Sequence, residues 1–261
     1  MSLIHPTATV EDGAKIGNNV TIGAYTYISK DVVIGNGTKV GSHTLIEGHT
    51  TIGEDNEIFS HAVIGSIPQD LKYAGERVEL IIGNRNKIRE FTLINPGTEG
   101  GGKVTRIGDD NLLMGYVHIA HDVIIGNHCI LANAATLAGH VELGNGVVIG
   151  GLTPIHQFVK IGDLAMIAGA SALSQDVPPY CLAEGNRASL RGLNLTGLRR
   201  HLPTEDTNAL RVAYKQIFMG EKNYKDAAQE LLKNSTNSHV LNMAKFIIES
   251  TRGIQFKRSN K

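Results

Sequence analysis

The hydrophobic residues along the chain recur every six positions. Twenty-six aliphatic residues follow this spacing in three runs, from Ile4 to Ile64, from Ile82 to Ile94 and from Ile107 to Leu173. A small residue follows many of them directly, as at Gly23 and Gly35. A period of six fits neither an amphipathic helix nor a single hairpin. It predicts a parallel β-helix, in which each six residues form one short strand and one corner and three such units complete a triangular turn.

The predicted coil also explains the composition. Equivalent aliphatic side chains should point inward and stack roughly 4.8 Å apart on successive turns, so such a core needs few large rings. The chain has 30 Gly, no Trp and only 5% aromatic residues. We expect the small residues to permit either tight corners or a close approach of the backbone of the next turn.

Two segments interrupt the repeat, near residues 66–81 and 95–106. The step from Ile64 to Ile82 is 18 residues, and the step from Ile94 to Ile107 is 13, which shifts the phase by one. Interruptions of a solenoid often carry function. A tolerated surface loop is the rival interpretation, and it is stronger for the Gly-rich second segment than for "PQDLKYAGE" in the first.

The repeat stops after Leu173, and helical patterns follow. They predict helices over 204–218, with Thr204, Glu205 and Asp206 as cap and first turn, and over 223–234 and 237–250. We therefore expect two domains, a β-helix over 1–186 and a helical domain over 187–261 that covers the open end of the coil.

The charge of the chain also changes sign at the start of the predicted helical domain. From Arg187 onward there are 14 Lys and Arg residues against 6 Asp and Glu, and the earlier residues hold 11 against 19. A basic end on an acidic body favours an acidic partner, or it is a solvated helical surface. The two cysteines have no metal-type spacing, and no signal peptide or membrane span is evident. We expect a cytoplasmic protein with no nucleic-acid partner.

Histidines gather in the third run. His118, His121 and His140 should lie on adjacent turns near one outer groove, with Asp122 beside His121. A histidine with a nearby carboxylate suits a general base. Ordinary structural histidines are the competing interpretation. Zinc is another, as in the gamma-type carbonic anhydrases built on this repeat, but their histidine pair is more widely spaced than His-x-x-His.

Ordered motifs outside the repeat resemble those of one enzyme family. They are "QDLKYAGE" (69–76), "HIAHD" (118–122), "ILANAATLAGHVELG" (130–144), "GGLTPIHQF" (150–158), "QDVPPY" (175–180), "AEGNRA" (183–188) and "GLNLTGLRR" (192–200). Together they cover nearly the whole chain. They resemble the acyl-carrier-protein-dependent UDP-N-acetylglucosamine O-acyltransferases, which carry an R-3-hydroxyacyl group to the 3-hydroxyl of the sugar nucleotide in the first step of lipid A synthesis.

The resemblance implies a role for each matching residue. His121 would be the general base, Asp122 would orient it, and the backbone N–H of Gly139 would stabilise the oxyanion. Gly169 would leave the acyl groove open for a long chain of the hydroxymyristoyl class. Asp70 and Lys72 match positions that contact the sugar nucleotide, and Asn194 and Arg200 match positions near the uridine diphosphate. The positions that support substrate binding around the base are His118, His140, His156 and Gln157.

The resemblance also implies a left-handed coil, a homotrimer with each site shared between neighbouring subunits, direct transfer without a cofactor, and acyl carrier protein as the acidic partner. Asn95 and Pro96 depart from the family, where His and Arg are common. This departure leaves open an acceptor with a 3-amine. A zinc enzyme, a non-catalytic binding platform and the sister N-acyltransferase compete with this interpretation. The sister enzyme usually has a domain before its repeats, whereas here the repeats begin at Ile4.

Overall fold

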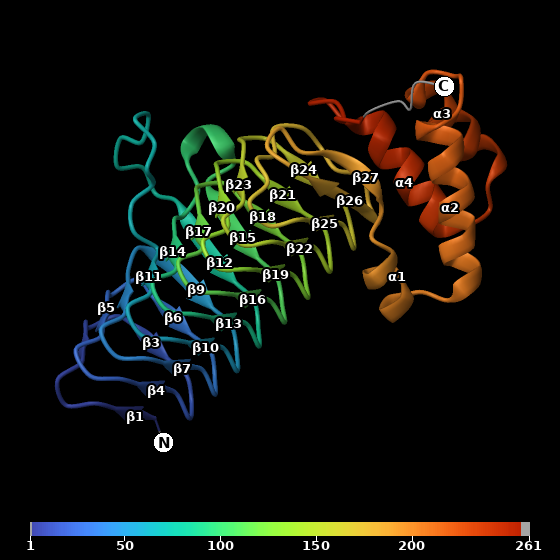
Figure 1. Ribbon diagram of the computed structural model, residues 1–261. Coiled ribbons are helices and arrows are strands. Elements are labelled where there is room, and N and C mark those ends of the chain that lie inside the picture. Colours follow the sequence, from blue (N-terminus) through green and yellow to red (C-terminus); the bar gives the residue numbers. More distant parts are fainter. Residues whose placement is uncertain (1, 257–261) are drawn as a thin grey trace.

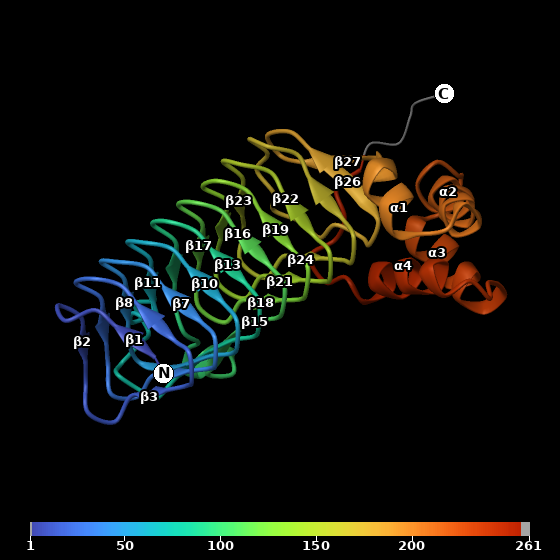
Figure 2. The same ribbon diagram turned by 90° about the horizontal axis from the view of Figure 1, so that it is seen from below.

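The computed structural model describes residues 2–256 and forms a three-sided, left-handed β-helix with helices at its C-terminal end (Figures 1 and 2). Each side is one sheet, and neighbouring strands within a sheet come from successive turns of the coil. The chain passes from sheet A to sheet B to sheet C and back to sheet A. We name the corners A–B, B–C and C–A in this order.

Sheet A has 11 strands. They are β1 (Leu3–Ile4), β4 (Thr21–Ile22), β7 (Lys39–Val40), β10 (Glu57–Ile58), β13 (Lys87–Ile88), β16 (Leu112–Leu113), β19 (Ile130–Leu131), β22 (Val148–Ile149), β25 (Met166–Ile167), β26 (Cys181–Glu184) and β27 (Ser189–Leu193).

Sheets B and C have 8 strands each. Sheet B contains β2 (Thr9–Val10), β5 (Tyr27–Ile28), β8 (Leu45–Ile46), β11 (Val63–Ile64), β14 (Leu93–Ile94), β17 (His118–Ile119), β20 (Thr136–Leu137) and β23 (Pro154–Ile155). Sheet C contains β3 (Lys15–Ile16), β6 (Val33–Ile34), β9 (His49–Ile52), β12 (Glu79–Ile82), β15 (Val104–Ile107), β18 (Ile124–Ile125), β21 (Glu142–Leu143) and β24 (Lys160–Ile161).

The six-residue repeat places one aliphatic side chain per strand inside the coil. Register pairs equivalent residues on successive turns, for example Ile94 with Ile119 and Ile119 with Leu137, and all three are fully buried. The first members of the repeat, Ile4 at 43% exposure and Val10, lie at the open N-terminal end. The predicted inward ladder is therefore present, and it is covered everywhere except at that end.

Where a small residue follows an inward side chain, it serves close approach between turns. A Cβ added at Gly23 would lie 2.6 Å from the backbone nitrogen of Ser42, and one at Gly41 would lie 2.6 Å from that of Ser60. The left-handed corner residues are mostly not glycine; Tyr25 and His43, for instance, have φ of 57° and 56°. Of the two purposes expected for the small residues, backbone approach is the one that applies at these positions.

Both interruptions are loops on the B–C corner. Ile64 ends β11 in sheet B and Ile82 ends β12 in sheet C, so these 18 positions advance the coil by only one side. The same is true between Ile94 in β14 and Ile107 in β15, where a short 3₁₀ helix, η1 (Glu99–Gly101), forms. We call residues 65–78 the first excursion and 95–103 the second excursion. Figure 1 shows both on one edge of the coil.

Within residues 2–256, four helices follow the coil: α1 (Leu195–His201), α2 (Thr204–Phe218), α3 (Tyr224–Asn234) and α4 (Ser238–Glu249). The sequence predicted the last three nearly to the residue and missed α1, which is short. Thr204 is the first helical residue and Pro203 occupies the cap position, so the prediction of Thr204 as the cap is wrong. No helix within residues 2–256 is long and apolar enough to cross a membrane.

The junction between coil and helices is a hairpin. β27 lies beyond residue 186 and pairs antiparallel with β26, which itself continues sheet A from β25. The helices begin only at Leu195. The division of the chain at residue 186 stays a prediction.

Candidate active site

The polar cluster that the sequence singled out lies on the B–C corner of successive turns. Asp122, His140 and Phe158 occupy equivalent left-handed corner positions, with φ of 59°, 62° and 63°. The backbone N–H of His140 donates to the carbonyl of His121 over 3.1 Å, and that of Phe158 donates to Gly139 over 3.1 Å. Regular stacking of the coil therefore aligns these side chains along one edge.

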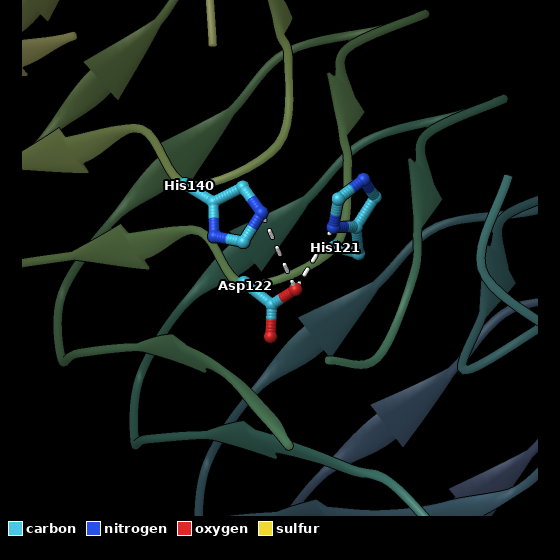
Figure 3. Close-up of side chains that lie close together, drawn as sticks. All are labelled: His121, Asp122 and His140. Carbon is cyan, nitrogen blue, oxygen red and sulfur yellow. Dashed lines mark hydrogen bonds and ion pairs between the residues drawn. The ribbon is translucent and has the colours of Figure 1, made fainter. Parts of the chain in front are cut away.

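His121 and Asp122 form a hydrogen-bonded pair (Figure 3). Nδ1 of His121 lies 2.8 Å from Oδ2 of Asp122, and the Asp122 side chain is fully buried. A carboxylate in this position accepts a hydrogen bond from Nδ1–H, and so favours the tautomer that has a free lone pair on Nε2. The imidazole is then oriented to take a proton at Nε2.

Gly139 lies directly against this imidazole. A Cβ at position 139 would be 2.4 Å from Cε1 and 2.7 Å from Nε2 of His121. The Gly139 N–H donates to no other group within residues 2–256. A free backbone donor next to a base is the arrangement that an oxyanion hole requires.

Two further histidines surround the pair. His140 packs edge-on to His121, with ring centroids 5.1 Å apart, and stacks on Phe158 at 4.3 Å. Burial lowers the pKa of His140, against the opposing effect of the Asp122 carboxylate. Burial also lowers the pKa of His118, whose Nδ1 is buried without a hydrogen-bond partner in the described chain. Both rings are therefore biased toward the neutral form near the base.

The two excursions wall a cavity beside the pair. Its volume is about 230 Å³, and its lining includes residues from the first excursion, the second excursion and the corner: Asp70, Lys72, Glu76, Thr98, Glu99, Gly100, His140 and Phe158. The Lys72 backbone N–H donates to Oδ1 of Asp70 over 3.0 Å. Asp70 and Lys72, named from sequence, thus lie near His140, the neighbour of His121.

The second excursion holds a residue that sequence reasoning missed. The hydroxyl of Thr98 donates to Oδ2 of Asp122 over 2.6 Å, and its backbone N–H donates to Oδ1 over 2.9 Å. The break in the repeat was the one sign that this loop mattered. A hydrogen bond from a loop to a residue 24 positions away does not alter the periodicity of the sequence, so Thr98 itself could not be identified.

Asn95, where the sequence departs from the family pattern, is a structural anchor. It is 1% exposed, and its Nδ2 donates to the carbonyls of Ser66 and Ile67 over 3.0 and 3.1 Å. The side chain therefore ties the second excursion to the start of the first. Its Oδ1 is buried and has no partner within residues 2–256.

The remaining predicted residues are not gathered in this cavity. His156 and Gln157 lie on the same corner beside Phe158, and His156 Nδ1 is 3.3 Å from a guanidinium nitrogen of Arg252. Gly169 lies on the A–B corner, next to the left-handed Ala170. Asn194 caps α1 and donates through Nδ2 to the carbonyl of Leu164, on the C–A corner. Arg200 lies on α1.

The cluster does not suit a zinc ion. Ligand atoms of His121, Asp122 and His140 do lie within 4.8 Å of one another. However, both carboxylate oxygens of Asp122 already accept hydrogen bonds from Thr98, and Nδ1 of His121 faces Asp122. An ion would have to replace these bonds, so the donor set favours proton transfer over metal binding.

Comparisons with known proteins agree on one family. A family profile described as "Udp N-acetylglucosamine O-acyltransferase; Domain 2" matches residues 176–255, and one for bacterial transferase hexapeptide repeats matches residues 105–139. The chain is 66% identical over 260 residues to an acyl-[acyl-carrier-protein]--UDP-N-acetylglucosamine O-acyltransferase from Sulfurovum sp., with 100% of both chains covered. It is 62% identical to the protein of that name from Aliarcobacter butzleri, covering 99% of this chain and 100% of that one.

A solved structure extends the likeness to three dimensions. The UDP-N-acetylglucosamine acyltransferase from Campylobacter jejuni superposes with a TM-score of 0.94 at 51% identity, covering 98% of this chain and 100% of that chain. The likeness therefore includes both excursions and the helical end.

Proposed function

The chain belongs to the UDP-N-acetylglucosamine O-acyltransferase family, and from this premise we propose that it transfers an R-3-hydroxyacyl group from acyl carrier protein to the 3-position of UDP-N-acetylglucosamine. This reaction is the first step of lipid A synthesis. We propose that the reaction takes place in the cytoplasm.

The observation that carries the proposal is the buried Asp122–His121 pair, whose imidazole lies against Gly139, a residue with no hydrogen bond from its backbone N–H within residues 2–256. In the reaction, Nε2 of His121 takes the proton of the sugar 3-hydroxyl while that oxygen attacks the thioester carbonyl carbon. The Gly139 N–H stabilises the oxyanion that forms, a contribution of roughly 3–4 kcal/mol for one such donor. The C–S bond then breaks, and the imidazolium returns its proton to the leaving thiolate.

We propose direct transfer, without a covalent acyl-enzyme, because neither cysteine of the chain suits the role of nucleophile. Cys129 and Cys181 are buried, and burial raises the pKa of the Cys129 thiol to about 11. Such a thiol stays protonated and inert near neutral pH. The thioester is already activated, so the reaction does not need an acyl-enzyme or a cofactor.

An apolar strip on sheet A supports an acyl groove. Outward side chains of Leu112, Ile130, Val148 and Met166 stack on successive turns, and Ile130 is 38% exposed. Outward positions of a solvated sheet face are usually polar. The strip approaches Gly169, the residue implied to leave the groove open for a chain of the hydroxymyristoyl class.

A homotrimer would complete the site. Sheet A and α1 do not border the B–C corner that carries His121, so Gly169, Asn194 and Arg200 must come from a neighbouring subunit if they contact the same substrates. Cyclic symmetry produces three identical clefts of this kind. In each one, the sugar nucleotide would contact Asp70, Lys72, His118, His140, His156 and Gln157 together with Asn194 and Arg200, and Arg200 suits a diphosphate. The basic helical end would receive the acidic acyl carrier protein.

A transfer assay tests this proposal. Purified protein is incubated with hydroxymyristoyl acyl carrier protein and either UDP-N-acetylglucosamine or its 3-amino analogue, and products are identified by mass. We expect ester formation that His121→Ala lowers by roughly a thousandfold or more. Transfer to the amine alone would revise the acceptor. Failure with both acceptors in correctly folded protein, or loss of activity with a chelator, would contradict the proposal.

A further inference from the structure

The second excursion crosses directly over the buried carboxylate of Asp122. Three donors reach this group: the Thr98 hydroxyl and Nδ1–H of His121 on Oδ2, and the Thr98 backbone N–H on Oδ1. Thr98 is itself 4% exposed. Two of the three donors that hold the carboxylate therefore come from one residue of a loop, and the coil provides only the third.

The loop has little freedom to move away from this position. A Cβ at Gly101 would lie 2.0 Å from Cγ of Asp122, and one at Gly97 would lie 2.1 Å from the Val104 nitrogen. The Thr98 carbonyl accepts from the N–H groups of Gly101 and Lys103 over 3.1 and 2.8 Å. The two glycines allow the backbone to pack flat against the carboxylate, and the turn bonds hold Thr98 above it.

We propose that Thr98 is a positioning residue that fixes the orientation of Asp122, and through it the tautomer of the base His121. The proposal rests on the acyl-transfer function described above. All three donors need an acceptor, and the two oxygens of the carboxylate supply the lone pairs that they require. The hydroxyl of Thr98 also shares Oδ2 with the imidazole, and so limits how strongly the carboxylate can stabilise a protonated His121.

Loss of the hydroxyl should change the acidity of the site in a defined direction. Without it, less of the negative charge of Asp122 is compensated, so the imidazolium form of His121 is favoured and the base stays protonated to a higher pH. Other ionisable groups facing the pair are unchanged by the substitution: His118 and His140 lie beside it, and Asp70, Lys72, Glu76 and Glu99 line the cavity. The acid limb of the pH–rate profile should therefore move toward higher pH.

The second excursion is also joined to the first. The Glu76 carboxylate accepts the backbone N–H of Glu99 over 3.2 Å and that of Ala74 over 2.8 Å. The two excursions, which wall the cavity beside the pair, are thus parts of one hydrogen-bonded unit, and Thr98 is its contact with Asp122.

The test compares Thr98→Val, Thr98→Ala and Thr98→Ser in the transfer assay, with kcat/KM measured across pH. Serine and alanine both remove the methyl group, so their difference reports the hydroxyl alone. We expect alanine and valine to lower kcat by roughly tenfold to a hundredfold, the range for a hydrogen bond to a charged group. They should shift the acid limb upward by roughly half a pH unit and leave KM for the sugar nucleotide nearly unchanged. Serine should behave as the unmodified protein.

Thr105→Val is the matched control. Thr105 is buried, and its hydroxyl oxygen accepts the backbone N–H of Asp122 over 2.8 Å, while among the described residues it makes no hydrogen bond to the Asp122 carboxylate. Its loss should lower the melting temperature and leave the acid limb in place. The proposal is overturned if Thr98→Ala keeps the unmodified profile, or if Thr105→Val shifts the limb equally. A chain that transfers no acyl group before any substitution would instead refute the proposed function.

Discussion

Two glycines with roles in the proposed reaction lack a side chain for different reasons. At Gly139 a Cβ would collide with the His121 ring at 2.4 Å, so packing within the chain requires glycine. At Gly169 a Cβ would meet only backbone atoms of Gly151, at 3.4 Å and beyond, which is ordinary contact. Packing within this chain therefore does not explain Gly169, which supports our proposal that this glycine leaves a groove open for the acyl chain.

Substitution of Gly169 should change the chain length that the enzyme accepts. Gly169→Met fits the chain sterically and would extend a side chain across the groove, so we expect preference to move from hydroxymyristoyl toward hydroxydecanoyl donors by roughly tenfold or more. Donors compete in one reaction, and product masses give the ratio. Gly115→Met, three turns earlier on the same corner with similar room at 3.3–3.4 Å, should leave the ratio unchanged. If both variants gave the same ratio of hydroxydecanoyl to hydroxymyristoyl product, the assignment of Gly169 would be contradicted.

At the scale of an element, the coil is held by polar ladders as well as by its aliphatic core. Asn56, Asn86 and Asn111 are buried on three successive turns. Oδ1 of Asn86 accepts both the backbone N–H and Nδ2 of Asn111, over 2.9 and 3.0 Å, and Asn56 does the same for Asn86. Cys129 occupies the equivalent position on the next turn, and its backbone N–H donates to Oδ1 of Asn111 over 2.7 Å. The ladder spans the turns that carry both excursions.

Substitution of one asparagine in this ladder should cost more stability than the loss of a single hydrogen bond. Asn86→Ala leaves the donors of Asn111 buried and unpaired, so we expect a loss of about 3 kcal/mol in the free energy of unfolding. This corresponds to a fall in melting temperature of roughly 5–10 °C. Asn84→Ala on the same turn is the control, because Asn84 belongs to a partly exposed ladder where water replaces the lost bonds. A similar fall in melting temperature in both variants would show that burial of the asparagine is unimportant.

At the scale of the whole molecule, the proposed substrate contacts lie on different edges of the coil. α1 packs on the C–A corner, where His201 shares a cavity of about 530 Å³ with His128, Asn145 and Asp163. His121 lies on the B–C corner, at the opposite edge of sheet C. Figure 1 likewise shows α1 away from the edge that carries the two excursions. One chain therefore cannot bring Arg200 to its own His121.

Mixed assemblies should separate a shared site from a site within one chain. Arg200→Ala should raise KM for the sugar nucleotide, and His121→Ala should abolish transfer. Co-expressed in equal amounts, the two variants would form trimers in which about a quarter of the clefts combine the unmodified His121 and Arg200. We expect partial recovery of activity, measured below the KM of the Arg200→Ala variant. Activity equal to the sum of the separately purified variants would argue against a shared cleft.

Sequence reasoning reached the fold because a period of six is a local property repeated over most of the chain. Each inward position, such as Ile94 or Ile119, needs only its own hexad to be recognised. Three of the four helices were found for the same reason, since caps and apolar periodicity are local; α1 has only 7 residues and too few periods to read. The pairing of His121 with Asp122 was also accessible, because the two residues are adjacent.

The sequence by itself determined the coil, the inward ladder, the interruptions and the candidate base with its neighbouring carboxylate. Only the tertiary structure decided that Thr98 holds that carboxylate, that Asn95 ties one excursion to the other, and that α1 lies at a different corner from His121. The physical reason is that a repeat is encoded every six residues. A hydrogen bond from a loop to a corner depends instead on where two irregular paths meet in space, and neither path leaves a period in the sequence.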